Sequence, residues 1–191
     1  MLALYRKLLK RYGKQGWWPA DSRYEVVIGA VLTQNTNWKN AEKALANLRE
    51  RNVLDEESIL KIPIGELEEL IRPSGFYRQK AERLKLATKK WLEIKNSKLE
   101  TTELREEWLS VKGIGKETAD SILLYAMDRP VFVIDAYTRR FCKEMMDKEF
   151  KEYDDCRRFF ENALPKDVEL YKEYHALIVA WGKEFRSREG P

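Results

Sequence analysis

Apolar residues recur at helical spacing along nearly the whole chain. A stripe that repeats every three or four residues marks the buried face of an amphipathic helix. The pattern predicts helices over residues 2–12, 55–61, 64–71, 76–95 and about 153–163, and others that begin near Ser22, Trp38 and Tyr137. The last helix carries the clearest stripe, made of Tyr174, Leu177, Ile178, Trp181 and Phe185. We therefore expect an all-α fold.

A tight turn, Gly113-Ile-Gly115, interrupts the helical pattern. Glycine accepts positive φ and has no Cβ, so another backbone can approach it closely. From Glu117 onward the spacing of apolar residues predicts a new helix, and the start of a helix attracts anions. Lys112 and Lys116 flank the turn and add positive charge. The pattern favours a phosphate-binding turn, although a Gly-x-Gly sequence alone is more often an ordinary helix corner.

Asp135 follows four consecutive apolar residues, Val131 to Ile134. We expect this run to place the carboxylate at the edge of a dry environment, where its charge acts strongly. The simpler interpretation is that Asp135 caps a helix beginning at Ala136. Both roles are compatible, and Asp135 is our candidate catalytic residue.

These segments resemble the helix-hairpin-helix DNA glycosylases of the endonuclease III superfamily. The defining pair is Val111-Lys-Gly-Ile-Gly-Lys-Glu-Thr-Ala119 and the following Val-x-Val-x-Asp135, and the likeness extends to Gly29-Ala-Val-Leu-Thr-Gln-Asn-Thr36 and to residues 71–81. It covers nearly the whole chain. The details most similar to the 3-methyladenine DNA glycosylase III branch are Trp17-Trp18-Pro19, Arg72-Pro-Ser-Gly-Phe-Tyr77 and Gly113-Ile-Gly-Lys-Glu117.

The resemblance implies a monomer with two helical lobes. One lobe would be continuous, residues 22–128, and would end in the helix-hairpin-helix. The other would combine residues 1–21 and 129–191, the two ends of the chain. Double-stranded DNA with a damaged base would meet the active-site cleft between the lobes, where the base is extruded.

The resemblance also implies roles for individual residues. The hairpin residues would bind the DNA backbone: Lys112, Gly113, Ile114, Gly115, Lys116 and Thr118. Gln34 would fill the space that the extruded base vacates, although a polar residue at a helix end is an adequate alternative. Asp135 would stabilise the positive charge that develops on the sugar.

The candidate base-binding residues are Trp17, Trp18, Pro19, Trp38 and Lys183. Tryptophans more often belong to a core, yet a Trp-Trp-Pro turn just outside a helix is an awkward core element. An indole face attracts a cationic methylated purine more than its neutral parent, by about 1–2 kcal/mol. An ordinary exposed lysine explains Lys183 equally well. His175, the single histidine, receives no chemical role.

Glu117 determines the expected reaction type. In bifunctional relatives this position holds a lysine that attacks the sugar, and a carboxylate cannot form a Schiff base. We therefore expect a monofunctional DNA glycosylase of base excision repair that removes alkylated purines, 3-methyladenine first. The alternatives are a mismatch glycosylase acting on thymine or uracil, and a DNA-binding module without catalysis.

Composition limits which cofactors the protein could bind and indicates where in the cell it acts. The chain has two cysteines, Cys142 and Cys156. A protein-bound iron–sulfur cluster normally takes four, so the cluster of many endonuclease III relatives is excluded. One histidine argues against zinc, and we expect buried thiols rather than a disulfide. We expect no metal cofactor, leaving open a monovalent cation at the hairpin. The net charge of +4 suits nucleic acid, and no apolar segment suggests a membrane. We expect a cytoplasmic, nucleoid-associated protein.

Overall fold

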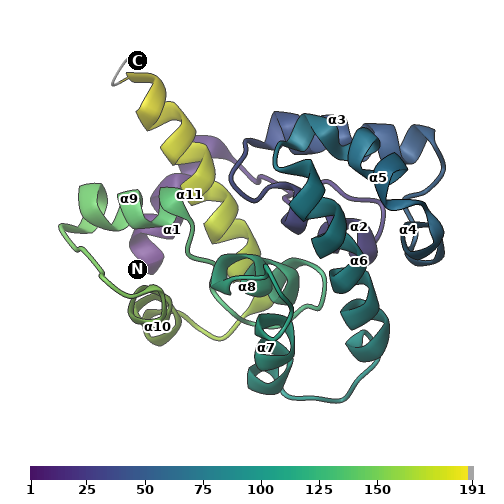
Figure 1. Ribbon diagram of the computed structural model, residues 1–191. Coiled ribbons are helices and arrows are strands. Elements are labelled where there is room, and N and C mark those ends of the chain that lie inside the picture. Colours follow the sequence, from purple (N-terminus) through teal and green to yellow (C-terminus); the bar gives the residue numbers. More distant parts are fainter. Residues whose placement is uncertain (189–191) are drawn as a thin grey trace. The chain divides into compact units, whose positions relative to one another are not determined.

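The computed structural model describes residues 1–188, and within that range no residue lies in a β-strand. Helices form where the apolar stripes predict them and also over Thr101–Leu109 and Arg72–Ser74, so the all-α prediction is confirmed (Figure 1). Their bounds are α1 Leu2–Tyr12, α2 Arg23–Leu32, α3 Trp38–Glu50, α4 Glu56–Lys61, α5 Ile64–Ile71, η1 Arg72–Ser74, α6 Tyr77–Ile94, α7 Thr101–Leu109, α8 Lys116–Tyr125, α9 Ala136–Met146, α10 Tyr153–Ala163 and α11 Val168–Arg188.

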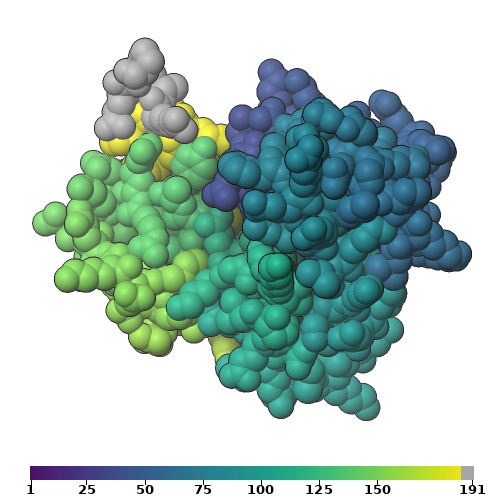
Figure 2. Space-filling model, viewed as in Figure 1, coloured from purple at the N-terminus to yellow at the C-terminus, as the bar shows by residue number. Residues whose placement is uncertain are grey.

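The chain divides into two compact units. One is continuous, from Ala20 to Met127, and contains α2 to α8. The other joins Met1–Pro19 to the chain from Asp128 onward, and contains α1 and α9 to α11. In the space-filling view, the continuous unit is coloured from blue to teal, and the chain after Asp128 from green to yellow (Figure 2). No described helix has both the length and the apolar character needed to cross a membrane.

Helix α2 is the central element of the continuous unit. Every residue from Tyr24 to Leu32 is buried, and the helix packs against α3, α6 and α8. Ser22 caps its start by accepting a hydrogen bond from the Glu25 amide at 3.1 Å. A helix that is apolar on all sides can be stable only when it is covered on all sides. The loop after Leu32, which carries Gln34, therefore leaves from a fixed position.

A buried lysine reinforces that position. The side chain of Lys80 is inaccessible to solvent, and its Nζ donates to the carbonyl oxygens of Leu32 at 2.8 Å and Ser74 at 2.7 Å. Burial, with a smaller contribution from the charge of Arg83, lowers the pKa of Lys80 to about 8. Lys80 thus joins the end of α2 to η1, a tie that the sequence pattern did not predict.

The other unit is built around an aromatic core. Phe132 and Phe160 stack with ring centroids 4.3 Å apart, and Tyr174 meets both rings edge-on. The run from Val131 to Ile134 is buried and lies outside any helix, so its backbone groups need other hydrogen-bond partners. The Phe132 amide donates to Glu161 and the Ile134 amide to the Tyr153 hydroxyl. This anchored segment leads directly to Asp135.

The two cysteines lie in this unit, Cys142 on α9 and Cys156 on α10. Both are free and buried, with their sulfur atoms 3.8 Å apart. The expectation of buried thiols rather than a disulfide is confirmed.

Candidate active site

The hairpin consists of α7, α8 and the turn between them, and its tip is exposed. Lys112, Gly113, Gly115 and Lys116 are open to solvent, whereas the Ile114 side chain is buried and anchors the turn. Gly113 has the left-handed φ of 87°, which favours glycine. Gly115 has a φ of −93°, so it does not use the positive φ that is open to glycine. The reason is its position as the N-cap of α8, where extended backbone is normal.

A buried ion pair fixes the two hairpin helices against each other. Arg105 of α7 donates to both carboxylate oxygens of Asp120 of α8, at 2.6 and 3.1 Å. Asp120 is inaccessible to solvent. A bidentate arginine–carboxylate pair restricts orientation as well as distance. Helix α8 begins at Lys116, one residue before the predicted Glu117, and its positive end is held at the tip.

Gln34 is bonded to this hairpin. Its Nε2 donates to the Gly113 carbonyl oxygen and to the Thr118 hydroxyl, both at 3.0 Å. The helix-end role belongs instead to Thr33, the C-cap of α2, whose hydroxyl donates to the Gly29 carbonyl oxygen at 2.9 Å. The structure therefore brings Gln34 and the hairpin together. Thr118 is only 8% exposed, and its hydroxyl accepts the hydrogen bond from Gln34.

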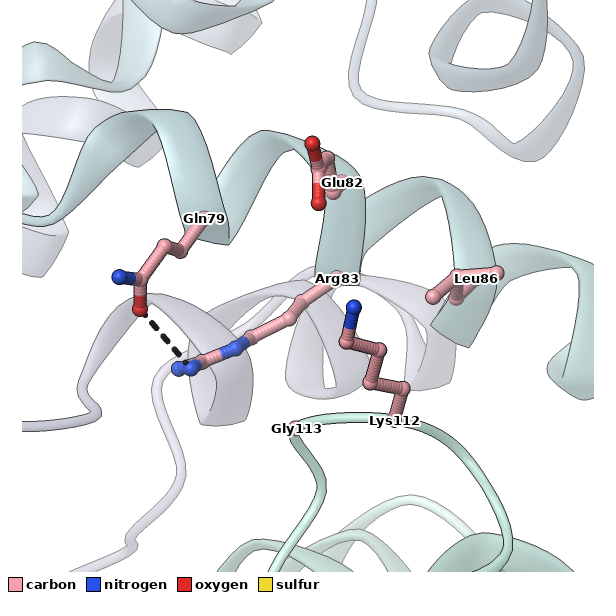
Figure 3. Close-up of a pocket in the computed structure, with 6 residues that line it drawn as sticks. All are labelled: Gln79, Glu82, Arg83, Leu86, Lys112 and Gly113. Atoms are coloured by element: carbon pink, nitrogen blue, oxygen red, sulfur yellow. Dashed lines mark hydrogen bonds between the residues drawn. The ribbon is translucent and has the colours of Figure 1, made fainter.

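Arg83, on α6, also contacts the Gln34 side chain. Its Nη1 donates to Gln34 Oε1 at 2.8 Å and its Nη2 to Gln79 Oε1 at 3.1 Å. A cavity of about 260 Å³ adjoins this arginine, lined by Gln79, Glu82, Arg83, Leu86, Lys112 and Gly113. Figure 3 shows Arg83 extending from α6 toward the hairpin, with Lys112 reaching back toward α6. Arg83 was missed in the sequence because an arginine in a charged helix carries no distinguishing local signal.

Phe76, also missed, is an exposed aromatic residue just before α6. Its side chain is 61% exposed, and its φ of 47° is left-handed. This conformation is sterically unfavourable for a bulky residue. Residues in such strained conformations cluster at functional sites. The available signal was Gly75-Phe76 directly before a helix, where a glycine turn presents an apolar side chain.

Asp135 is the N-cap of α9, as its simpler interpretation predicted. Its Oδ1 accepts hydrogen bonds from the Thr138 amide at 2.7 Å and the Thr138 hydroxyl at 2.9 Å. Its Oδ2 lies 3.4 Å from His175 Nε2, on α11. The carboxylate is 15% exposed, so it is largely desolvated but still reachable.

Several opposing effects act on this carboxyl group. Burial by itself would raise the pKa of Asp135, but the electrostatic interaction with His175, together with the hydrogen bonds from Thr138, lowers the pKa below its usual value. Asp135 is therefore an ionised, oriented carboxylate at neutral pH. His175, which had no predicted chemical role, is therefore the side chain that pairs with Asp135 from α11. The pairing depends on the packing of α9 against α11.

The candidate base-binding residues are distributed over both units. Trp17 and Trp18 are partly exposed neighbours with ring centroids 5.2 Å apart and planes at 42°, and Pro19 is exposed. They share the unit of Asp135 with Lys183, which is exposed on α11. Trp38, partly exposed at the start of α3, belongs to the unit of Gln34 and the hairpin. Among the described residues, no group of three or more His, Cys, Asp or Glu side chains could hold a metal ion.

Comparison with known proteins identifies this arrangement. Residues 28–166 match the HhH-GPD superfamily base excision DNA repair protein model, a region that includes Gln34, the hairpin and Asp135. The chain belongs to the HhH-GPD superfamily of base excision DNA repair proteins. It is a DNA glycosylase of base excision repair.

Three relatives illustrate the similarity. A candidate DNA repair glycosylase of Methanocaldococcus jannaschii is 53% identical over 190 residues, 95% of this chain and 86% of the relative. The endonuclease III of Thermotoga maritima is 26% identical over 98% of this chain and 85% of its own. Among solved structures, the H. pylori 3-methyladenine DNA glycosylase bound to 1,N6-ethenoadenine matches with a TM-score of 0.80 and 33% identity, covering 96% of this chain and 95% of that one.

Proposed function

We propose that this glycosylase is monofunctional and removes alkylated purines, such as 3-methyladenine, from double-stranded DNA. The observation that carries the proposal is Asp135, a largely buried carboxylate whose pKa is lowered and whose oxygens are oriented by Thr138 and His175. Such a group is suited to stabilising a cation on the sugar. The likeness to the H. pylori enzyme supports the choice of substrate.

The hairpin would hold the DNA backbone. The positive end of α8 and the exposed side chains of Lys112 and Lys116 favour binding of phosphates. Backbone donors and lysines contact phosphates without reading bases, so binding is expected to be independent of sequence and weakened by salt. Ile114 contributes only through its backbone because its side chain is buried.

Two side chains would occupy the duplex when the damaged base leaves it. Gln34 would fill the vacated space, as the family resemblance implies. Phe76 is exposed and apolar, the kind of side chain that proteins insert between base steps. Unstacking costs a few kcal/mol, and inserted side chains offset part of that cost.

The extruded base would stack on tryptophan. Alkylation at a ring nitrogen makes a purine cationic, and an indole face attracts a cation by about 1–2 kcal/mol when both are desolvated. Trp17 and Trp18 are partly exposed and adjacent, which leaves ring surface available for stacking. A cationic base is also a good leaving group, so the proposal requires no general acid.

The bond that breaks joins the sugar C1′ to the purine nitrogen, and its electron pair leaves with the base. The base departs neutral, and the positive charge develops on the sugar. Asp135 stabilises that charge and orients a water molecule, whose oxygen bonds to C1′ while its proton passes to solvent. The products are a free base and an abasic site. Glu117 cannot act as an amine nucleophile and Lys116 is turned about 100° away from that position, so strand cleavage is not expected.

The test is release of free methylated bases from alkylated duplex DNA by wild type and Asp135→Asn. Asparagine keeps an oxygen that can accept from Thr138, so the substitution removes the charge and preserves the cap. Asp155→Asn, at an exposed position on α10, is the matched control. We expect release of 3-methyladenine by wild type and the control, almost none by Asp135→Asn, and strand breaks only after alkali.

Other outcomes would redirect the proposal. Breaks without alkali would show lyase activity and refute the monofunctional assignment. Tight, salt-sensitive binding without release would refute the alkylated-purine assignment, and thymine or uracil opposite guanine would be the next substrates. Binding without excision of any base would leave a DNA-binding module.

A further inference from the structure

The carboxamide of Gln34 is engaged at both ends. Its two amide hydrogens point to the Gly113 carbonyl oxygen and the Thr118 hydroxyl, and its oxygen accepts from Arg83. All of these partners belong to the continuous unit. A side chain held in this way cannot also extend into a duplex. Gln34 must exchange these protein contacts for DNA contacts.

The hairpin glycine provides the room for Arg83. A Cβ on Gly113 would lie 2.3 Å from Nε and 2.7 Å from Cδ of Arg83, far inside van der Waals contact. The aliphatic part of the arginine therefore crosses directly over the Gly113 backbone. Gln79 holds the other guanidinium nitrogen from one turn earlier on α6, which restricts the arginine further (Figure 3). Glycine at 113 thus accommodates a protein side chain as well as a turn.

We propose that Arg83 is a positioning residue that holds the Gln34 side chain against the hairpin in the DNA-free enzyme. The inference rests on the proposed role of Gln34 in filling the duplex. Insertion then requires the Arg83–Gln34 bond to break, so Arg83 slows insertion. A hydrogen bond from a charged donor is about twice as strong as one between neutral groups, which makes Arg83 the partner whose loss is felt most.

Insertion can be measured without base excision. The duplex carries a stable tetrahydrofuran abasic analogue next to 2-aminopurine, whose fluorescence rises when a side chain disturbs its stacking. Stopped-flow traces are compared for wild type, Arg83→Met, Gln34→Ala and the double variant. Arg78→Met is the matched control, because Arg78 is an exposed arginine on the same helix and its loss removes the same charge.

We expect Arg83→Met to insert about 10-fold faster than Arg78→Met, the size that follows from losing one charge-assisted hydrogen bond. In the Gln34→Ala background, Arg83→Met should behave like Arg78→Met. Equal effects of Arg83→Met in both backgrounds would show that Arg83 binds DNA itself and would overturn the proposal. Slower insertion by Arg83→Met would also overturn it, because the arginine would then assist Gln34. If Gln34→Ala left the fluorescence change unaltered, Gln34 would not be the side chain that enters the duplex, and the proposal would be overturned.

A second measurement reads the contact directly in the DNA-free protein. The side-chain amide protons of Gln34 can be followed in a nitrogen–proton NMR spectrum. Arg83→Met should shift them and speed their exchange with solvent, while Arg78→Met should leave them unchanged. Unchanged signals in Arg83→Met would overturn the proposal even if that variant were less stable. Conversely, failure to excise alkylated purines alongside intact Arg83–Gln34 coupling would refute the substrate and leave the positioning role standing.

Discussion

Substituting Gly182 by alanine tests the contact between α9 and α11 that brings Asp135 and His175 together. A Cβ on Gly182 would lie 2.4 Å from Cδ1 and 3.1 Å from Cγ of Tyr137. Ordinary carbon–carbon contacts are about 3.5–4.0 Å, so the ring or the helix has to move by roughly 1 Å. Tyr137 is the second residue of α9, and Asp135 is the N-cap of the same helix.

Two effects of opposite sign set the magnitude. Overpacking of this kind costs about 1–3 kcal/mol. Replacing glycine by alanine inside a helix raises the free energy of unfolding by up to about 1 kcal/mol. We therefore expect Gly182→Ala to lower the free energy of unfolding by about 1–2 kcal/mol, which for a chain of this size lowers Tm by about 2–8 °C.

Gly65→Ala is the matched control. Gly65 lies in the first turn of α5, and a Cβ there would meet nothing within 4 Å. We expect that variant to be as stable as wild type or more stable by about 0.5 kcal/mol. Calorimetry gives both values, and single-turnover excision at a temperature where each variant is folded gives the functional effect. We expect several-fold slower excision only in Gly182→Ala. Equal stabilisation of both variants would refute the packing argument.

Three further predictions follow from individual side chains. His175→Gln removes an imidazole that helps to lower the pKa of Asp135, so the acid limb of the pH–rate profile for excision should move to higher pH. The stability that ionised Asp135 provides is lost as pH falls through its folded pKa, and urea titrations in acid should show a smaller loss in His175→Gln than in wild type. The pKa of Lys80 is lowered to about 8, below the usual value of 10.5. The unfolded chain therefore binds more protons between these values, and stability should rise with pH across that window in wild type but not in Lys80→Met. Phe76→Ala should leave Tm unchanged within a degree or two, because the ring is exposed, yet slow insertion and excision several-fold.

Local patterns in the sequence were sufficient for the helices and for the chemistry of single positions. Helical spacing placed the elements because burial of one face requires that period whatever the partner. The capping position of Asp135 and the left-handed conformation of Gly113 could also be inferred from the sequence, because each depends on a few neighbouring residues. Gly115 takes an extended backbone conformation for an equally local reason, because it is the N-cap of α8.

Only the tertiary structure decided the contacts between distant residues. Arg83 meets Gln34 across 49 positions, and Lys80 meets the end of α2 across 48. Likewise, His175 reaches Asp135 only because α9 packs against α11. The periodic pattern indicates that a helix has a buried face, but it does not indicate which helix packs against that face. Packing makes that choice, and with it the orientation of the Asp135 carboxylate and the contacts of the Gln34 side chain.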